Sequence, residues 1–210
     1  MAIVCGIDPS LTSTGIAILG GGRPMLLRSV GNGTLSAHSY NARGERVEKQ
    51  VADIFEAVDA KLKGRRITLA GIEGAAYGAA NASTHDGSHL WWEIHDELRH
   101  RGVPIVVVAP PTRCLWATGK GGKESKELTT TQHKRKALAK VRETWHPWRS
   151  HIINHDVADA LTIAEILARG AGQQLHFEPE RRHVEAMVNK INWPSGFCVK
   201  PEYMQAGAVR

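Results

Sequence analysis

Two kinds of hydrophobic pattern alternate along the chain. Short apolar runs rich in β-branched residues predict buried strands, whereas apolar positions spaced three and four residues apart predict amphipathic helices. Runs of the first kind occur five times, at Ala2–Asp8, Gly15–Leu19, Met25–Thr34, Ile67–Glu73 and Val103–Val108. The first three follow one another with short connections and therefore predict an antiparallel meander.

Helical spacing is clearest in Arg43–Leu62, and a second long helix is predicted over Ala82–Arg101. A short helical turn from Pro110 precedes three more predicted helices, over Lys134–Glu143, from the N-cap Asn154 to Arg169, and over Glu180–Lys190. The order βββαβαβααα is typical of an α/β fold with helices on the faces of a mixed sheet. The less regular pattern after Gly170 predicts a domain at 1–170 and a C-terminal extension at 171–210.

The composition supports an ordinary globular core. Apolar residues make up 42% of the 210 residues, which is enough to bury a core and too much for a wholly disordered chain. No apolar run approaches the ~20 residues of a membrane-spanning helix, and no secretory signal is visible. Cys5, Cys114 and Cys198 are odd in number and far apart. We therefore expect reduced thiols and a reducing compartment such as the cytoplasm.

The positive charge is concentrated in one segment. The formal net charge is +6, but Thr112–Arg149 alone holds ten basic and three acidic residues, a net +7. A segregated basic block favours a polyanionic partner. A solvated helix face is the alternative, and the scarcity of balancing acids argues against it. We expect DNA contacts from basic side chains of this block, namely Arg113, Lys120, Lys123, Lys126, Lys134, Arg135 and Lys136.

Aromatic residues and histidines crowd the end of this block, at Trp145, Trp148, His146, His151 and His155. Their spacing is irregular and no cysteine joins them, so packing at the surface or at an interface is favoured over a zinc site. Trp91 and Trp92 fit either a dimer interface or packing within the chain.

Four acids differ from the solvated ones in their positions. Asp8 and Glu73 each end an apolar strand, and Asp156 and Asp159 lie three residues apart on one helix face. An ordinary cap or surface charge is the alternative for each acid alone, and for Asp156 a charge at the helix N-terminus. The four together favour a shared site, because acids at the ends of apolar strands are costly to bury unpaired.

Clustered carboxylates have a definite chemical use. Hard Mg²⁺ prefers carboxylate oxygens, and two such ions ~4 Å apart activate a water and stabilise the leaving oxygen of a phosphodiester. The four acids, next to a segment that attracts phosphates, thus predict metal-dependent hydrolysis of nucleic acid.

Four motifs, in order, resemble those of the RuvC-type Holliday-junction resolvases of the RNase H-like superfamily, including phage-type members. They lie at Gly6–Ser10 with Gly15–Ile18, at Ile72–Glu73, at Val108–Thr112 with Thr118–Gly121, and at Asp156–Leu161. The resemblance runs from about Ile3 to Ala168, which is most of the chain.

The resemblance implies an RNase H-like fold: a mixed five-stranded sheet, with three antiparallel and two parallel strands, flanked by helices. It also implies a homodimer and Mg²⁺- or Mn²⁺-dependent nicking of four-way DNA junctions in recombination and repair. The metal ligands, two ions per site, fall on Asp8, Glu73, Asp156 and Asp159. The family's catalytic basic position falls on Lys123 or Lys126, and its junction-contacting aromatic on Tyr77, one place later than in the family's pattern.

Two other functions fit parts of the sequence. A module that binds branched DNA without cutting would use the basic block, but four acids beside phosphates would repel DNA without metal ions. An ATPase of the actin and sugar-kinase type would also open with an acid, a turn and a strand pair, but it needs a second phosphate loop and a larger chain. We therefore expect an endonuclease that leaves a 5′-phosphate and a 3′-hydroxyl.

Overall fold

A computed structural model describes residues 2–31, 39–75, 82–119, 130–195 and 197. Five strands form one sheet: β1 (Ile3–Asp8), β2 (Thr14–Gly20), β3 (Arg23–Val30), β4 (Leu69–Glu73) and β5 (Ile105–Val108). The strand order is β3-β2-β1-β4-β5. Both β1–β2 and β2–β3 are antiparallel, whereas β4 runs parallel to β1 and β5 parallel to β4. The predicted mixed sheet of three antiparallel and two parallel strands is confirmed.

The helices are α1 (Tyr40–Leu62), α2 (Ala82–His100), α3 (Pro110–Thr118), α4 (Thr130–Thr144), the 3-10 helix η1 (His146–His151), α5 (His155–Gly170) and α6 (Arg181–Asn189). Helix α1 begins three residues before its predicted start, because Ser39 Oγ accepts the backbone N–H of Ala42 and caps it. The predicted N-cap of α5 is confirmed, since Asn154 Oδ1 accepts the N–H of Val157 at 3.0 Å. Helix η1 was not predicted from the sequence.

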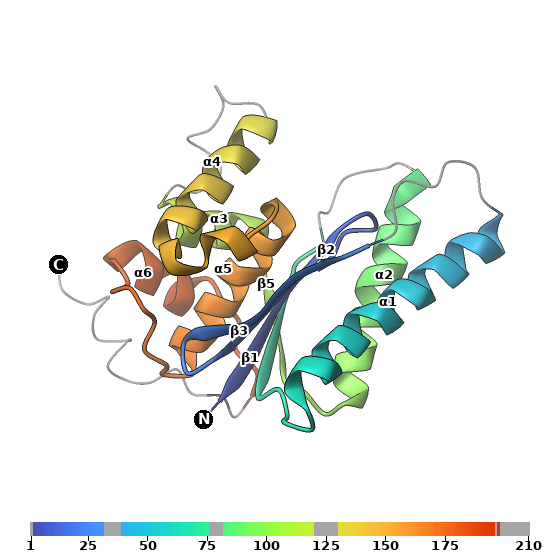
Figure 1. Cartoon of the computed structure of the whole chain (residues 1–210), viewed down its shortest axis with the longest axis horizontal. Coiled ribbons are helices and arrows are strands. Elements are labelled where there is room, and N and C mark those ends of the chain that lie inside the picture. The colour runs from blue at the N-terminus through green and yellow to red at the C-terminus, as the bar shows by residue number, and fades with distance from the viewer. Residues whose placement is uncertain (1, 32–38, 76–81, 120–129, 196, 198–210) are drawn as a thin grey trace.

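The sheet lies between two helical layers (Figure 1). Helices α1 and α2 cover one face around Ile54, Leu90 and Ile94, and α5 covers the other together with α3, α4 and α6. Almost every residue of α5 is buried, which places it at the centre of its layer. None of the helices in the described ranges is long and apolar enough to cross a membrane.

Two glycines let α5 lie directly on the sheet. A Cβ built on Gly6 of β1 would be 2.1 Å from the carbonyl oxygen of Ala160, and one on Gly15 of β2 would be 1.9 Å from that of Asp156. Real Cβ atoms do not come this close to backbone oxygens, so only glycine fits here. The contact at Gly15 fixes the first turn of α5 beside Asp8, which pairs with Gly15 in the sheet.

Residues after α5 pack on the same layer. Leu175, Met187 and Ile191 are buried in the core that contains α5. The Gln173 side chain accepts the N–H of Gly22 at 2.6 Å and donates to the carbonyl of Ala2 at 3.1 Å. The division of the chain at Gly170 stays a prediction.

Candidate active site

The sheet topology brings the four predicted acids to one place. Strands β1 and β4 are parallel neighbours in which Ile7 pairs with Ile72, so Asp8 and Glu73 end the two strands at the same edge. Helix α5 crosses this edge and contributes Asp156 and Asp159 from its first two turns. The charges of Glu73 and Asp159 both act on Asp8, and that of Asp156 acts on Asp159.

These four carboxylates are largely shielded from solvent. Asp8, Asp156 and Asp159 are 7%, 5% and 5% exposed, and Glu73 is partly buried. Burial raises the pKa of Asp8 well above its usual range, and the hydrogen bond to Glu73 and the charges of Glu73 and Asp159 raise it further. Burial likewise raises the pKa of Asp159 to about 7, although Arg113 opposes the shift. The acids therefore form one electrostatically coupled cluster.

The guanidinium of Arg113 lies inside this cluster. Its Nε donates to Glu73 Oε1 at 2.6 Å, and its Nη1 donates to Asp159 Oδ1. Burial opposes the charge of Arg113, but Asp159 and Glu73 more than offset this and raise its pKa. We predicted a DNA contact for Arg113, which stays a prediction, whereas the structure shows a buried cation between two acids. The position of Arg113 one helical turn after β5, the neighbour of β4, is the sequence signal for this placement.

We expect Arg113→Met to destabilise the protein in the absence of divalent ions by about 3 kcal/mol, because two buried carboxylates lose their partner. Addition of Mg²⁺ should then raise the melting temperature of the variant more than that of the wild type. Thermal unfolding with and without Mg²⁺ measures both effects. The control is Arg43→Met, which removes the more exposed pair with Asp86 and should leave the Mg²⁺ effect unchanged. Equal Mg²⁺ stabilisation of wild type and Arg113→Met would contradict this assignment.

Trp91 supports the end of β4, a role that the sequence did not reveal. Its indole Nε1 donates to the backbone carbonyl of Glu73 at 2.8 Å, and its ring packs partly buried against the core under α2. Trp92, the next residue, is 57% exposed. The indole of Trp91 thus fixes the backbone from which Glu73 extends.

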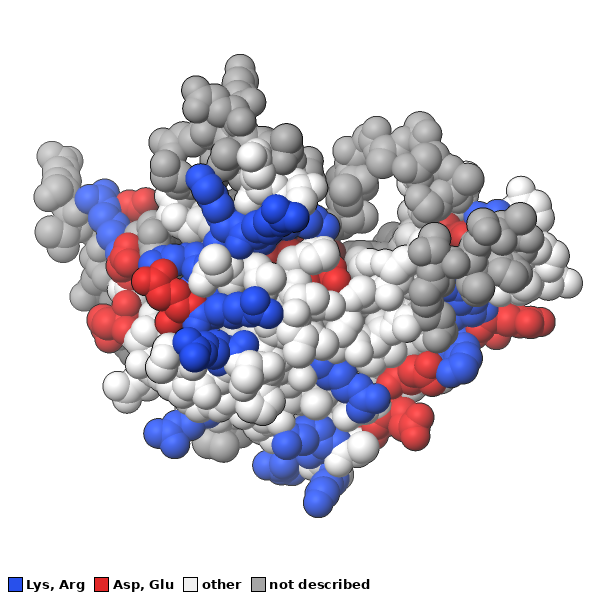
Figure 2. Space-filling view, turned by 45° about the horizontal axis from the view of Figure 1, so that its top comes forward, with Lys and Arg blue, Asp and Glu red and all other residues white. Residues whose placement is uncertain are grey.

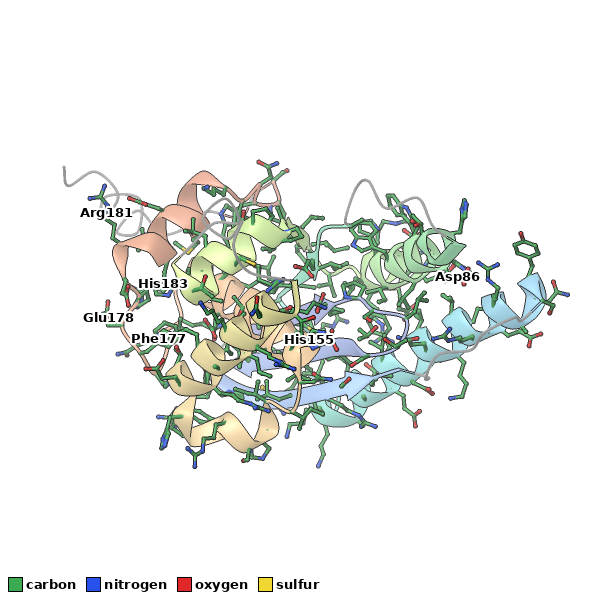
Figure 3. All side chains as sticks on the ribbon, turned by 90° about the horizontal axis from the view of Figure 1, so that it is seen from above. Asp86, His155, Phe177, Glu178, Arg181 and His183 are labelled. Carbon is green, nitrogen blue, oxygen red and sulfur yellow. The ribbon has the colours of Figure 1, made fainter. Side chains whose placement is uncertain are left out.

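The basic block reaches the cluster through α4. Lys134 Nζ lies 3.0 Å from His155 Nε2, and this nitrogen lies 3.1 Å from Asp156 Oδ1. Figure 3 shows His155, the first residue of α5. Lys134, Arg135 and Lys136 are all exposed, and Figure 2 shows basic side chains gathered over this side of the molecule. Four predicted site residues, Tyr77, Lys120, Lys123 and Lys126, lie outside the described residues.

The donor chemistry of the cluster fits a hard divalent cation. The guanidinium of Arg113 pairs with two of the four carboxylates, Glu73 and Asp159, while burial raises the pKa of Asp8 and of Asp159. Carboxylate oxygens are the ligands that Mg²⁺ prefers. In the described part of the chain, no three His, Cys, Asp or Glu side chains are arranged to hold a metal ion as they are placed. Two of the four acids, Glu73 and Asp159, instead bind Arg113.

Comparison with known proteins identifies the architecture. The chain superimposes on Thermus thermophilus RuvC in complex with a Holliday junction substrate with a TM-score of 0.54 at 18% identity, covering 79% of this chain and 91% of that one. The chain has the RuvC fold. A second Thermus thermophilus RuvC structure gives a TM-score of 0.51 at 21% identity, covering 78% and 90%. No family model and no curated protein matches the sequence.

This finding confirms the RNase H-like fold that the resemblance of the motifs implies. The first motif forms the β1–β2 hairpin and the second ends β4. The third covers the end of β5 and the start of α3, and the fourth lies in α5. These described parts of the motifs lie at or beside the edge where the carboxylates meet, and Lys120 and Gly121 of the third motif lie outside the described residues.

Proposed function

We propose that the protein is a structure-selective endonuclease that resolves four-way or other branched DNA by metal-dependent hydrolysis of phosphodiester bonds. The convergence of Asp8, Glu73, Asp156 and Asp159 at one edge of a RuvC-fold sheet carries this proposal. An acidic cluster of this kind beside a basic surface suits a reaction that must both attract phosphates and hydrolyse them.

The four acids, Asp8, Glu73, Asp156 and Asp159, would hold two Mg²⁺ or Mn²⁺ ions. The ions supply activation of water and stabilisation of the leaving oxygen. Arg113 already binds Glu73 and Asp159, and its charge would keep these carboxylates oriented before the ions bind. Lys123 or Lys126 would balance the charge that develops on the phosphate.

The α4 surface would bind the DNA backbone. The side chains of Lys134, Arg135 and Lys136 are exposed. Lys134 contacts His155, which in turn contacts Asp156. Phosphates bound along α4 would therefore pass close to the acids. One of the two similar structures is RuvC in complex with a Holliday junction substrate, which supports branched DNA as the partner. The protein would act on this DNA as a homodimer in a reducing cytoplasm. Tyr77 would contact the DNA at the junction.

The proposal is tested with a labelled synthetic four-way junction, a Y-shaped DNA and a linear duplex of the same sequence. We expect cuts in the junction with Mg²⁺ or Mn²⁺, none in EDTA, and slow or absent cutting of the duplex. The products should carry 5′-phosphates and be religated by DNA ligase. Binding of the junction without cleavage under any metal condition would instead favour a non-cutting binding module.

The triple variant Lys134→Ala, Arg135→Ala, Lys136→Ala tests the α4 surface. Each lost phosphate contact should reduce the slope of log K against log salt by about 0.9, so the slope should fall by about 2 to 3. Fluorescence anisotropy of a labelled junction at several salt concentrations measures it. The matched control lies across the sheet and combines Lys49→Ala and Lys61→Ala on α1 with Lys63→Ala at its C-cap. An unchanged slope in the α4 variant would exclude this surface.

A further inference from the structure

A second buried carboxylate, separate from the acidic cluster, lies farther along α5. Glu165 is 3% exposed, and its oxygens accept hydrogen bonds from two indoles: Trp116 Nε1 donates to Oε2 at 2.6 Å, and Trp145 Nε1 donates to Oε1. Both tryptophans are fully buried. Burial raises the pKa of Glu165 to about 7, while the two indole bonds act in the opposite direction. Each carboxylate oxygen of Glu165 thus accepts one indole N–H.

The two indoles lie near the two ends of the basic block, Thr112–Arg149. Trp116 lies in α3, and Trp145 directly follows the last residue of α4. Between them, residues 117–144 contain eight of the ten basic residues of the Thr112–Arg149 block. Both ends of this stretch are therefore tied to the same carboxylate, one through each indole.

The contacts around this carboxylate connect it to the candidate active site. Trp116 follows Arg113 by one helical turn, so α3 is joined to α5 at Asp159 through Arg113 and at Glu165 through Trp116. The imidazole of His183 packs edge-on against Trp116 at 4.8 Å, and that of His176 packs against Trp145 at 4.0 Å. Residues after α5 thus hold both indoles from the outer side.

A buried carboxylate that accepts two neutral donors is a costly way to fill a core position, because an apolar side chain would avoid the desolvation penalty. The carboxylate, however, fixes the orientation of both indoles, because each oxygen accepts one N–H with a preferred hydrogen-bond geometry. We propose that Glu165 is a positioning residue that fixes both ends of the basic segment relative to Asp156 and Asp159. The inference rests on the proposed function for its purpose, but its structural content can be tested separately.

Hydrogen exchange followed by mass spectrometry tests the anchoring directly. The amide of Glu165→Gln keeps one acceptor and turns an N–H toward the other indole, so one anchor is lost. We expect amides of α3 and α4 to exchange about tenfold faster, with β1 and α2 unchanged. The control is Thr162→Val, which removes another buried hydrogen bond of α5, to the carbonyl of Ala158, without touching α3 or α4. Uniformly faster exchange, or none, would overturn the proposal.

Single-turnover junction cleavage separates positioning from general stabilisation. Trp116→Phe frees α3 near Arg113, and we expect about tenfold slower cleavage at saturating DNA with an unchanged Kd. Trp145→Phe frees the end of α4, and we expect a severalfold higher Kd with an unchanged rate at saturation. Equal effects of both variants on rate and Kd would show a merely structural role. If the wild type cuts no junction, the proposed function fails, while the exchange experiment still decides the anchoring.

Discussion

The Asp8→Asn variant is expected to lose junction cleavage by on the order of 10³-fold or more while binding the junction as the wild type does. Asp8 lies at the centre of the cluster, where the charges of Glu73 and Asp159 both act on it. The amide has the same shape but lacks the negative charge that would hold the ions. Cleavage in Mg²⁺ and binding in EDTA are measured on the same labelled junction.

The pH dependence of protein stability provides an independent test of the Asp8→Asn variant. Burial and neighbouring acids raise the pKa of Asp8, so ionisation of Asp8 destabilises the wild type as the pH rises through that value. Asn cannot ionise, and Asp8→Asn should therefore be the more stable protein at pH 8 without divalent ions. The control Asp53→Asn breaks an exposed pair with Lys49 on α1 and should change neither cleavage nor this pH dependence. Cleavage by Asp8→Asn at the wild-type rate would exclude Asp8 from the site.

The Gly15→Ala variant is expected to lose about 4 kcal/mol or more of its free energy of unfolding, at the upper end of single substitutions. The added methyl would lie 1.9 Å from the carbonyl oxygen of Asp156, and neither backbone can yield without moving α5 from the sheet. Urea denaturation measures the loss, and any folded fraction should bind Mg²⁺ more weakly because Asp156 has moved away from Asp8.

Gly44→Ala in α1 is the matched control, because nothing lies within 4 Å of the methyl it would add. Alanine is the better helix former, so this variant should gain up to about 1 kcal/mol. If Gly15→Ala were as stable as the wild type, the close approach of α5 to β2 would be wrong.

Much of the fold and the acidic cluster could be predicted from the sequence, because both depend on local patterns. The β-branched runs gave all five strands, with β3 ending at Val30 instead of Thr34. The acids were recognisable because a charge at the end of an apolar strand is unusual. Their convergence then follows from parallel neighbouring strands, which end at the same edge of a sheet.

The inward contacts could not be predicted, because they depend on which helix faces meet. Trp145 was expected at the surface or an interface, and this was wrong: its indole is fully buried and bonded to Glu165, twenty residues along the chain. Arg113 was grouped by its charge with the basic residues expected to contact DNA, and its pairing with Glu73 and Asp159 was not anticipated. The sequence gives the charge of a segment, but the direction of each side chain depends on how the helices pack.

The position of α5 has a consequence for the way the active site assembles during synthesis. Asp8 leaves the ribosome well before Asp156 and Asp159, which follow only after β5, α3 and α4. The hairpin of β1 and β2 can form early from local contacts, but it has no partner for its glycine face until α5 arrives. We therefore expect the four acids to meet only in a late folding step, so that nascent chains lack the assembled acidic cluster.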